Sequence, residues 1–143
     1  TSDLPPVQVD REQIKQVFLN ILLNAIEATR ENGKIDVKTR SFIKPDGEPY
    51  VQIEFTDTGS GIPEEYLEDI FNPFFTTKST GSGLGLSISN QIIQDHKGYI
   101  HVESQVNKGS SFFINLPVNQ EYPKRRKSDL ENNQNISNIF EGR

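Results

Sequence analysis

The sequence predicts an α+β domain, a two-layer sandwich in which helices pack on one face of a mainly antiparallel sheet. Two observations carry this prediction. Apolar residues recur with helical spacing in two stretches of the chain, and elsewhere they alternate with polar residues in pairs of strands joined by turn-forming residues. The chain has 143 residues, which suits one domain with its own hydrophobic core.

The first elements are a short strand and a long helix. Residues 7–10 alternate like a strand, and from Asp10 to about Arg30 the apolar period becomes helical. Asp10 is a good N-cap, and Asn32-Gly33 ends the helix with a turn. The apolar residues of this helix are Ile14, Val17, Phe18, Ile21, Leu22, Ala25 and Ile26.

Two alternating strands and a long loop follow. Residues 34–43 and 50–57 alternate apolar with polar residues, and Pro45-Asp46-Gly47 between them predicts a hairpin turn. Residues 58–82 are rich in glycine and short polar residues, and only 64–71 within them look helical. A loop of this length in a compact domain is typically functional or disordered.

The last elements are a second helix, a closing strand pair and a polar tail. The helix is expected from about Leu84 to His96, with Gly98 in its C-cap region. Residues 99–104 and 111–117 then form an antiparallel pair around the turn Asn107-Lys108-Gly109. We therefore expect a domain over 1–118 and a flexible tail over 119–143, which is polar and rich in asparagine.

Composition narrows the class of protein. The chain has no cysteine, which excludes disulfides and thiolate metal sites, and its formal net charge of −5 argues against general affinity for nucleic acid. No apolar run approaches the roughly 18 residues of a membrane span. We expect a cytoplasmic domain. Its start without an initiator Met suggests a piece of a longer protein, and the sequence leaves open whether that longer protein is anchored in a membrane.

The long helix carries a polar stripe away from its apolar one. Asn20, Asn24 and Glu27 fall at i, i+4 and i+7. Asparagine is a mediocre helix former, because its side chain competes for backbone hydrogen bonds. The stripe is either a solvated face or a set of amide oxygens that bind a hard cation or phosphate.

Asp57 stands at the end of a predicted strand, in the segment DTGSGIP (57–63). Its carboxylate, held there, suits an exocyclic amine such as that of adenine, whereas the simpler interpretation is an ordinary turn. Gly59 and Gly61 can adopt positive φ and let the backbone approach a ligand closely.

A second glycine cluster, GSGLGLS (81–87), precedes and opens the second helix. Free N–H groups at a helix N-terminus, together with the helix dipole, favour an anion. The segment is neither the dinucleotide fingerprint nor a P-loop. Before it, FNPFFTTK (71–78) puts three phenylalanines in a polar loop, which indicates a hydrophobic plug, a mobile lid, or both.

Taken together and in order, NILLNAIEA, DTGSGIP, FNPFFTTK and GSGLGLSIS closely resemble the four motifs of the catalytic domain of sensor histidine kinases. That domain belongs to the superfamily of gyrase-type, heat-shock chaperone and mismatch-repair ATPases. The resemblance covers about residues 4–117. It implies a Bergerat-type sandwich of a mixed, mostly antiparallel sheet and about three helices, with an ATP lid over 62–82.

The resemblance also implies cofactors and residue roles. The cofactors are ATP and Mg²⁺, with Asn24 as metal ligand, Asn20 beside it near the phosphates, and Asp57 on the adenine amine. Gly59 and Gly61 would shape the base site, and Gly83, Leu84 and Gly85 would present amides to the phosphates. The full set implied to bind ATP is Asn20, Asn24, Asp57, Gly59, Gly61, Ile62, Lys78, Gly81, Gly83, Leu84, Gly85, Leu86 and Ser110.

Asn20 separates the branches of this superfamily. The ATPases carry a glutamate one turn before the magnesium asparagine, whereas the amide of Asn20 cannot act as a general base. The expected reaction is therefore phosphoryl transfer, which needs mainly positioning and charge neutralisation. Glu27 replaces the Lys or Arg of many members, as in nitrogen-regulator-type and sporulation-type kinases, and either Lys78 or Arg30 supplies the missing charge.

The phosphoacceptor histidine of the family lies in an upstream dimerisation domain. His96 and His101 resemble structural positions of the family, so we expect neither to be phosphorylated. The implied partners are the protein's own dimerisation domain and a response regulator; the fragment is expected as a monomer and the full-length protein as a homodimer. The alternatives are a nucleotide-binding regulatory module without phosphotransfer and an anti-sigma-type serine kinase.

Overall fold

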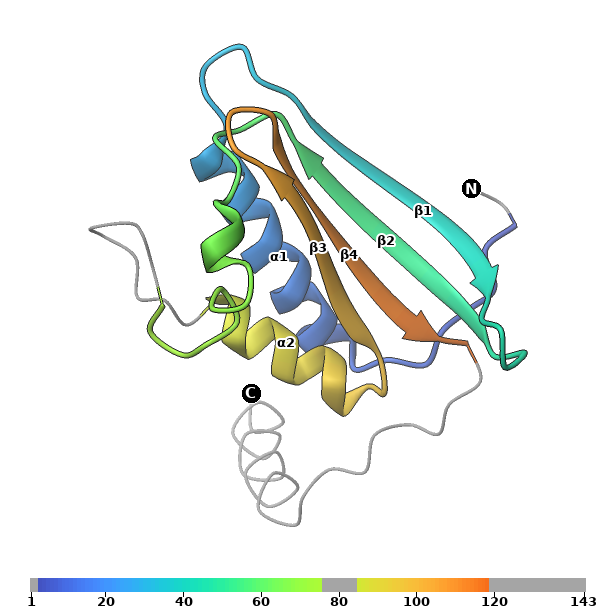
Figure 1. Ribbon diagram of the computed structural model, residues 1–143. Helices are drawn as coiled ribbons and strands as arrows, with labels where there is room; N and C mark the ends of the chain where they lie inside the picture. Colours follow the sequence, from blue (N-terminus) through green and yellow to red (C-terminus); the bar gives the residue numbers. More distant parts are fainter. Residues whose placement is uncertain (1–2, 76–84, 119–143) are drawn as a thin grey trace, which may run out of the picture.

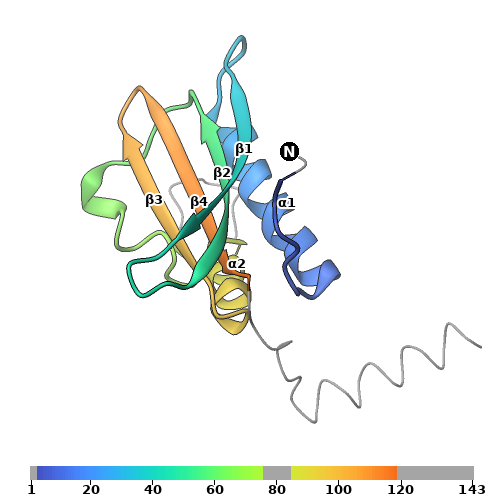
Figure 2. The ribbon, with the colours of Figure 1, turned by 90° about the vertical axis from the view of Figure 1, so that its right-hand side faces the viewer.

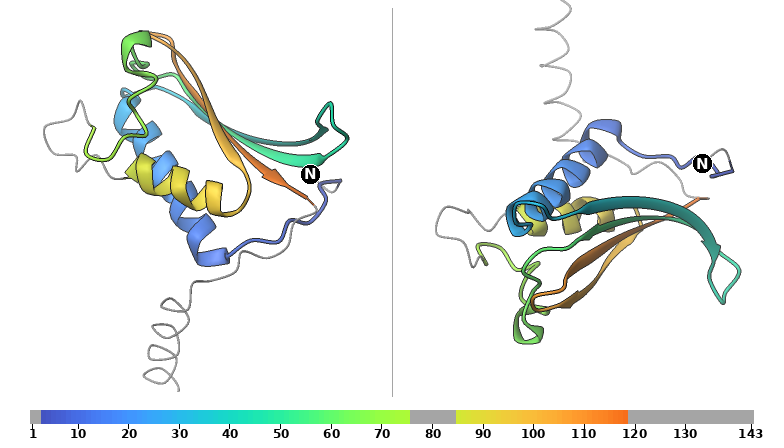
Figure 3. Two further views of the ribbon diagram at one scale, coloured as in Figure 1. Left: turned by 60° about the horizontal axis from the view of Figure 1, so that its bottom comes forward. Right: turned by 90° about the horizontal axis from the view of Figure 1, so that it is seen from above.

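The computed structural model describes residues 3–75 and 85–118. In this part of the chain the four strands form one sheet in the order β1-β2-β4-β3, with every pairing antiparallel (Figure 1). The two α-helices lie together on one face of the sheet (Figures 2 and 3), which confirms the α+β fold class. The elements are α1 (Arg11–Ala28), β1 (Ile35–Ile43), β2 (Pro49–Asp57), the 3-10 helix η1 (Glu64–Tyr66), α2 (Gly85–Asp95), β3 (Tyr99–Gln105) and β4 (Gly109–Pro117).

The core lies between the two α-helices and the sheet. Alternate residues of the central strands β2 and β4 point to the helices, because side chains alternate between the faces of a strand. They meet residues of α1 and α2 that recur every three or four positions. The core residues of these elements are Ile14, Val17, Ile21, Val51, Ile53, Phe55, Ile92, Ile93, Phe112, Ile114 and Leu116.

Several details differ from the sequence-based expectation. Residues 7–10 are not a strand: Asp10 instead caps α1 by accepting a hydrogen bond from the Gln13 amide, at 3.1 Å. α1 ends at Ala28, because Thr29 turns extended and its amide closes onto the Ala25 carbonyl. Among the described residues the sheet has no parallel pair, and the short helix expected within 64–71 is a single 3-10 turn.

His96 joins the two α-helices at the edge of the core. The residue is fully buried, and its Nε2 atom accepts a hydrogen bond from the Asp10 amide at 3.0 Å. Its Nδ1 atom lies 2.8 Å from the Ile92 carbonyl and donates to it, because a carbonyl can only accept. The ring is therefore neutral, and it ties the start of α1 to the end of α2.

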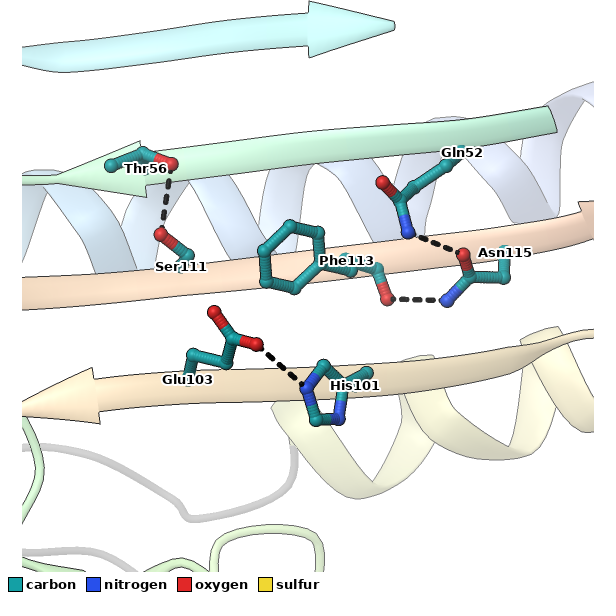
Figure 4. A network of polar contacts seen from close by, with 7 residues as sticks. All are labelled: Gln52, Thr56, His101, Glu103, Ser111, Phe113 and Asn115. Atoms are coloured by element: carbon teal, nitrogen blue, oxygen red, sulfur yellow. Dashed lines mark hydrogen bonds and ion pairs between the residues drawn. The ribbon is translucent and has the colours of Figure 1, made fainter. Parts of the chain in front are cut away.

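The other face of the sheet carries neither α1 nor α2, and a polar network lies on part of it (Figure 4). The Gln52 amide donates to the Asn115 side-chain oxygen at 2.8 Å, although both side chains are buried. Thr56 and Ser111 pair their hydroxyls at 2.9 Å. His101 lies exposed on this face beside Glu103.

Two of the domain predictions lie partly or wholly outside the described residues. These are the lid over 62–82, of which 76–82 are not described, and the tail over 119–143. Within the described residues, none of the helices combines the length and the apolar character that crossing a membrane requires.

Candidate functional site

A row of three polar residues marks the end of the sheet where β2 stops and β4 begins. Asp57 on β2 stands opposite Ser110 on β4, and Ser110 stands opposite Ser104 on β3. Each has the same strand parity as core residues such as Phe55 and Phe112, so the row faces the helices. At this end of the sheet, the side chains that face the helices are polar, whereas further along the same strands they are apolar.

Asp57 is buried, with 3% of its surface exposed. Its Oδ1 atom accepts hydrogen bonds from the Gly59 amide at 2.8 Å and the Ser110 amide at 3.3 Å. Its second oxygen, Oδ2, has no hydrogen bond within the described part of the chain. Because a buried carboxylate oxygen without a donor is costly, this atom suits a ligand that brings an N–H group.

The glycines after Asp57 are needed for packing of the protein backbone itself. A Cβ on Gly59 would lie 2.4 Å from the Ala28 carbonyl oxygen, at the end of α1. Gly61 has φ +73°, and a Cβ there would lie 2.2 Å from the Gln105 carbonyl oxygen. The Asn107 amide also donates to the Ser60 carbonyl at 2.8 Å. The loop is therefore held between α1 and the β3–β4 turn, which fixes the backbone around Asp57.

A second group of polar atoms lies where α1 meets α2. The Asn20 side-chain amide donates to the Gly85 carbonyl and to the Ser89 hydroxyl, both at 3.2 Å. Its Oδ1 atom has no hydrogen bond within the described residues. Asn24 follows one turn along α1 and is also half-buried. Asn20, the first residue of the stripe, therefore borders the start of α2 and does not lie on a fully solvated face.

The start of α2 offers backbone donors beside this stripe. The first four N–H groups of a helix have no intrahelical partner, and the helix dipole places partial positive charge there. Gly85 is the first described residue of α2, and a Cβ on it would lie 3.8 Å from Asn20 Cγ. When amide oxygens and free N–H groups lie next to each other, the oxygens can bind a hard cation and the N–H groups can bind the anion that accompanies it.

The structure thus gathers most of the predicted site residues into two groups. Asp57, Gly59, Gly61, Ile62 and Ser110 form the first. Asn20, Asn24, Gly85 and Leu86 lie on α1 and the beginning of α2. Lys78, Gly81, Gly83 and Leu84 are outside the described residues.

Sequence reasoning missed Ser104. Its hydroxyl joins Ile62 and Ser110, so it belongs to the first group. The available signal was a polar residue at an inward position of a strand, after Ile100 and Val102, which pack against the core.

Comparison with known proteins gives one family. Residues 9–120 match the family described as "Histidine kinase-, DNA gyrase B-, and HSP90-like ATPase". Sporulation kinase E of Bacillus subtilis (strain 168) is 44% identical over 127 residues, which cover 89% of this chain and 17% of that protein. The signal transduction histidine-protein kinase AtoS of Escherichia coli (strain K12) is 44% identical over 118 residues, 82% of this chain and 19% of that protein.

Similar solved structures point to the same family. A nucleotide-free catalytic domain of the histidine kinase ThkA matches with a TM-score of 0.68 and 45% identity, covering 84% of this chain and 74% of that one. Full-length ShkA in complex with AMPPNP matches with a TM-score of 0.67 and 26% identity, covering 85% of this chain and 25% of that one. The chain spans less than a fifth of the length of the two curated relatives described above.

Proposed function

Because the chain belongs to the family of histidine kinase-, DNA gyrase B- and HSP90-like ATPases, and its named relatives include a signal transduction histidine-protein kinase, we propose that it is the ATP-holding part of a sensor histidine kinase. It binds Mg-ATP and donates the γ-phosphoryl group to a histidine on a separate dimerisation and phosphoacceptor domain. The observation that carries the proposal is the buried Asp57 carboxylate with one oxygen unsatisfied within the described residues.

At the base end of the nucleotide, Asp57 Oδ2 accepts a hydrogen bond from the adenine amine. Oδ1 is already held by the Gly59 and Ser110 amides, so the carboxylate is oriented before the base arrives. A preorganised acceptor loses little side-chain freedom on binding and therefore contributes more of its interaction to affinity.

At the phosphate end, Asn24 holds Mg²⁺ through its amide oxygen, and Asn20 lies beside it. These residues fit the ion, because magnesium takes a few oxygen ligands and keeps waters and phosphate oxygens for its other positions. The bound ion supplies positive charge that offsets the charge of the phosphates. The N–H groups at the start of α2 contact the phosphates, together with Lys78, Gly81, Gly83 and Leu84 from the preceding segment.

The environment of Asn20 supports transfer rather than hydrolysis. Its amide donates to Gly85 and Ser89, and an amide has no basic group with which to deprotonate water. Water at the γ-phosphate is thus left without a general base at this position. In this proposal the acceptor comes from the protein's own dimerisation domain in the cytoplasm, and the phosphoryl group then passes to a response regulator.

Phosphotransfer between separate domains tests the proposal directly. The chain is mixed with γ-labelled ATP, Mg²⁺ and the dimerisation domain of its own parent protein, and label on the dimerisation domain is measured over time. We expect label that requires all components and that is lost when the acceptor histidine is replaced. Nucleotide binding without any transfer at high domain concentration would contradict the kinase half of the proposal.

The magnesium assignment has its own test. Asn24→Ala should reduce the magnesium dependence of ATP binding, since it removes the proposed protein ligand, while the affinity for ADP without metal should change little. Asn90→Ala on α2 is a matched control, because it removes the same side chain from a half-buried helical position that the site does not use. An unchanged magnesium dependence in Asn24→Ala would show that another residue holds the ion.

A further inference from the structure

Ser104 connects three parts of the first group of site residues. Its Oγ atom accepts a hydrogen bond from the Ile62 amide at 2.7 Å, where the proposed lid begins. It donates to the Gly109 carbonyl at 3.1 Å and lies 2.7 Å from the Ser110 hydroxyl. One side chain on β3 thus holds the lid's first residue and the side chain next to Asp57.

The hydrogen atoms of this cluster can be assigned from the chemistry of its members. A serine hydroxyl has one donor hydrogen and two acceptor lone pairs. A carbonyl only accepts, so the hydrogen of Ser104 is used on Gly109, and one lone pair of Ser104 is taken by the Ile62 amide. The remaining lone pair therefore accepts from Ser110, which makes Ser110 the donor of the 2.7 Å pair.

This assignment sets what Ser110 offers to a ligand. Its only hydrogen is directed at Ser104, so both lone pairs of the Ser110 hydroxyl are left as acceptors. Asp57 Oδ2, on the neighbouring strand, is also an acceptor. Two neighbouring acceptors, Asp57 Oδ2 and the Ser110 hydroxyl oxygen, favour an exocyclic amine, the group of adenine, and disfavour a carbonyl oxygen, which guanine has at the corresponding position.

We propose that Ser104 is a positioning residue that makes the base site selective for adenine, by holding the hydrogen of the Ser110 hydroxyl so that Ser110 offers the base an acceptor and not a donor. The inference rests on the proposed function and deepens it. Ser104 acts through Ser110 and the Ile62 amide and does not itself contact the nucleotide.

Matched hydroxyl deletions on the two faces of the sheet test this inference. Ser104→Ala frees the Ser110 hydrogen, which can then donate to a guanine carbonyl. Ser111→Ala is the control, because it breaks a similar hydroxyl pair, with Thr56 at 2.9 Å, on the outer face (Figure 4). Ser104→Thr keeps the hydroxyl and should restore the wild-type behaviour. Calorimetry with ADP and with GDP gives both affinities for each variant.

We expect Ser104→Ala to lower ADP affinity about three- to tenfold, the effect of one neutral hydrogen bond, without lowering GDP affinity. Ser111→Ala and Ser104→Thr should keep the wild-type ADP to GDP ratio. Equal loss of both nucleotides in Ser104→Ala, or the same change in Ser111→Ala, would overturn the inference, because it would show only a general loss of structure.

A second variant keeps the test independent of the folding of Ser104→Ala. Ser110→Ala removes the acceptor itself, so it should weaken ADP more than GDP, and an unchanged ADP affinity would overturn the inference. The proposed function fails separately: if the wild-type chain binds no ADP, or if Asp57→Asn binds it normally, both claims are overturned. If Asp57→Asn weakens ADP and the serine variants do not, only the inference about Ser104 fails.

Discussion

Among single residues, Asp57 combines burial with an unmet requirement for a hydrogen-bond donor. A carboxylate at 3% exposure is stabilised by the two backbone amides on Oδ1, and Oδ2 is left for a ligand. The unsatisfied Oδ2 atom lowers the folding stability, and such a local cost is typical of a binding site.

Replacing Asp57 by Asn should weaken ADP binding by about 1.5–3 kcal/mol, the scale of a hydrogen bond to a charged group. The amide oxygen can keep the contacts of Oδ1, but the NH₂ group then opposes the adenine amine. Isothermal calorimetry measures the change. Asp46→Asn, in the exposed β1–β2 turn, is the control; equal ADP affinity in Asp57→Asn and wild type would refute the adenine assignment.

His96 has a structural role, since its ring links the start of α1 to the end of α2. His96→Leu should lower the free energy of unfolding by about 1–3 kcal/mol, because the part-buried Asp10 amide loses its acceptor inside the protein. Urea denaturation measures the loss. His101→Leu, on the exposed face, should change stability by less than about 0.5 kcal/mol, and equal effects of the two variants would contradict the bridging role.

At the scale of the elements, the two hairpin turns look alike in sequence but differ in their surroundings. Gly47 in the β1–β2 turn has φ +91°, and a Cβ there would meet nothing within 4 Å. Gly109 in the β3–β4 turn has φ +120°, and its Cβ would lie 1.9 Å from the Asp57 carbonyl oxygen. Only the second glycine is tied to the site.

Alanine at the two positions should therefore behave differently. Gly47→Ala should cost about 1–2 kcal/mol of unfolding free energy, the strain of a left-handed L-residue. Gly109→Ala should cost clearly more and should also weaken ADP binding, because the backbone of Asp57 must shift. Thermal unfolding and calorimetry on both variants check this, and similar behaviour of the two would mean that the close approach at Gly109 does not matter.

The end of α2 lies close to where the sequence predicts it, but glycine plays a different part there than expected. The sequence predicts Gly98 in the C-cap region, where glycine usually supplies positive φ. In the structure Lys97 takes φ +64°, and the Gly98 amide closes the helix onto the Ile93 carbonyl at 2.9 Å. Gly98 is required by packing, since a Cβ there would lie 2.1 Å from the Asn115 carbonyl oxygen on β4.

At the scale of the whole molecule, the core between β4 and the two α-helices fixes how the two groups of site residues lie relative to each other. Ile114 is fully buried in this central strand, so Ile114→Ala should lower the free energy of unfolding by about 2–5 kcal/mol. Ile43, exposed at 73% on the edge strand, is the control and should tolerate alanine. Chemical denaturation measures both, and a small effect at Ile114 would mean that the core can collapse around the deletion.

Much of this arrangement was determined by the sequence alone. Period-two and period-3.6 patterns predicted both α-helices and both hairpins, since these patterns record which face of an element is buried. The order of the four motifs predicted the family, and with it Asp57, Asn20 and Asn24 as site residues. The family is confirmed by the comparisons, whereas the individual residue roles remain predictions.

Only the tertiary structure decided how distant segments meet. That Asp57, Ser110 and Ser104 form one row follows from the order β2-β4-β3, which no local pattern contains. The contact of Asn20 with Gly85 joins residues 65 positions apart. Local spacing shows which face a residue occupies, but hydrogen-bond partners across strands and helices depend on register and packing. For that reason the sequence pointed to Asp57, and only the fold pointed to Ser104.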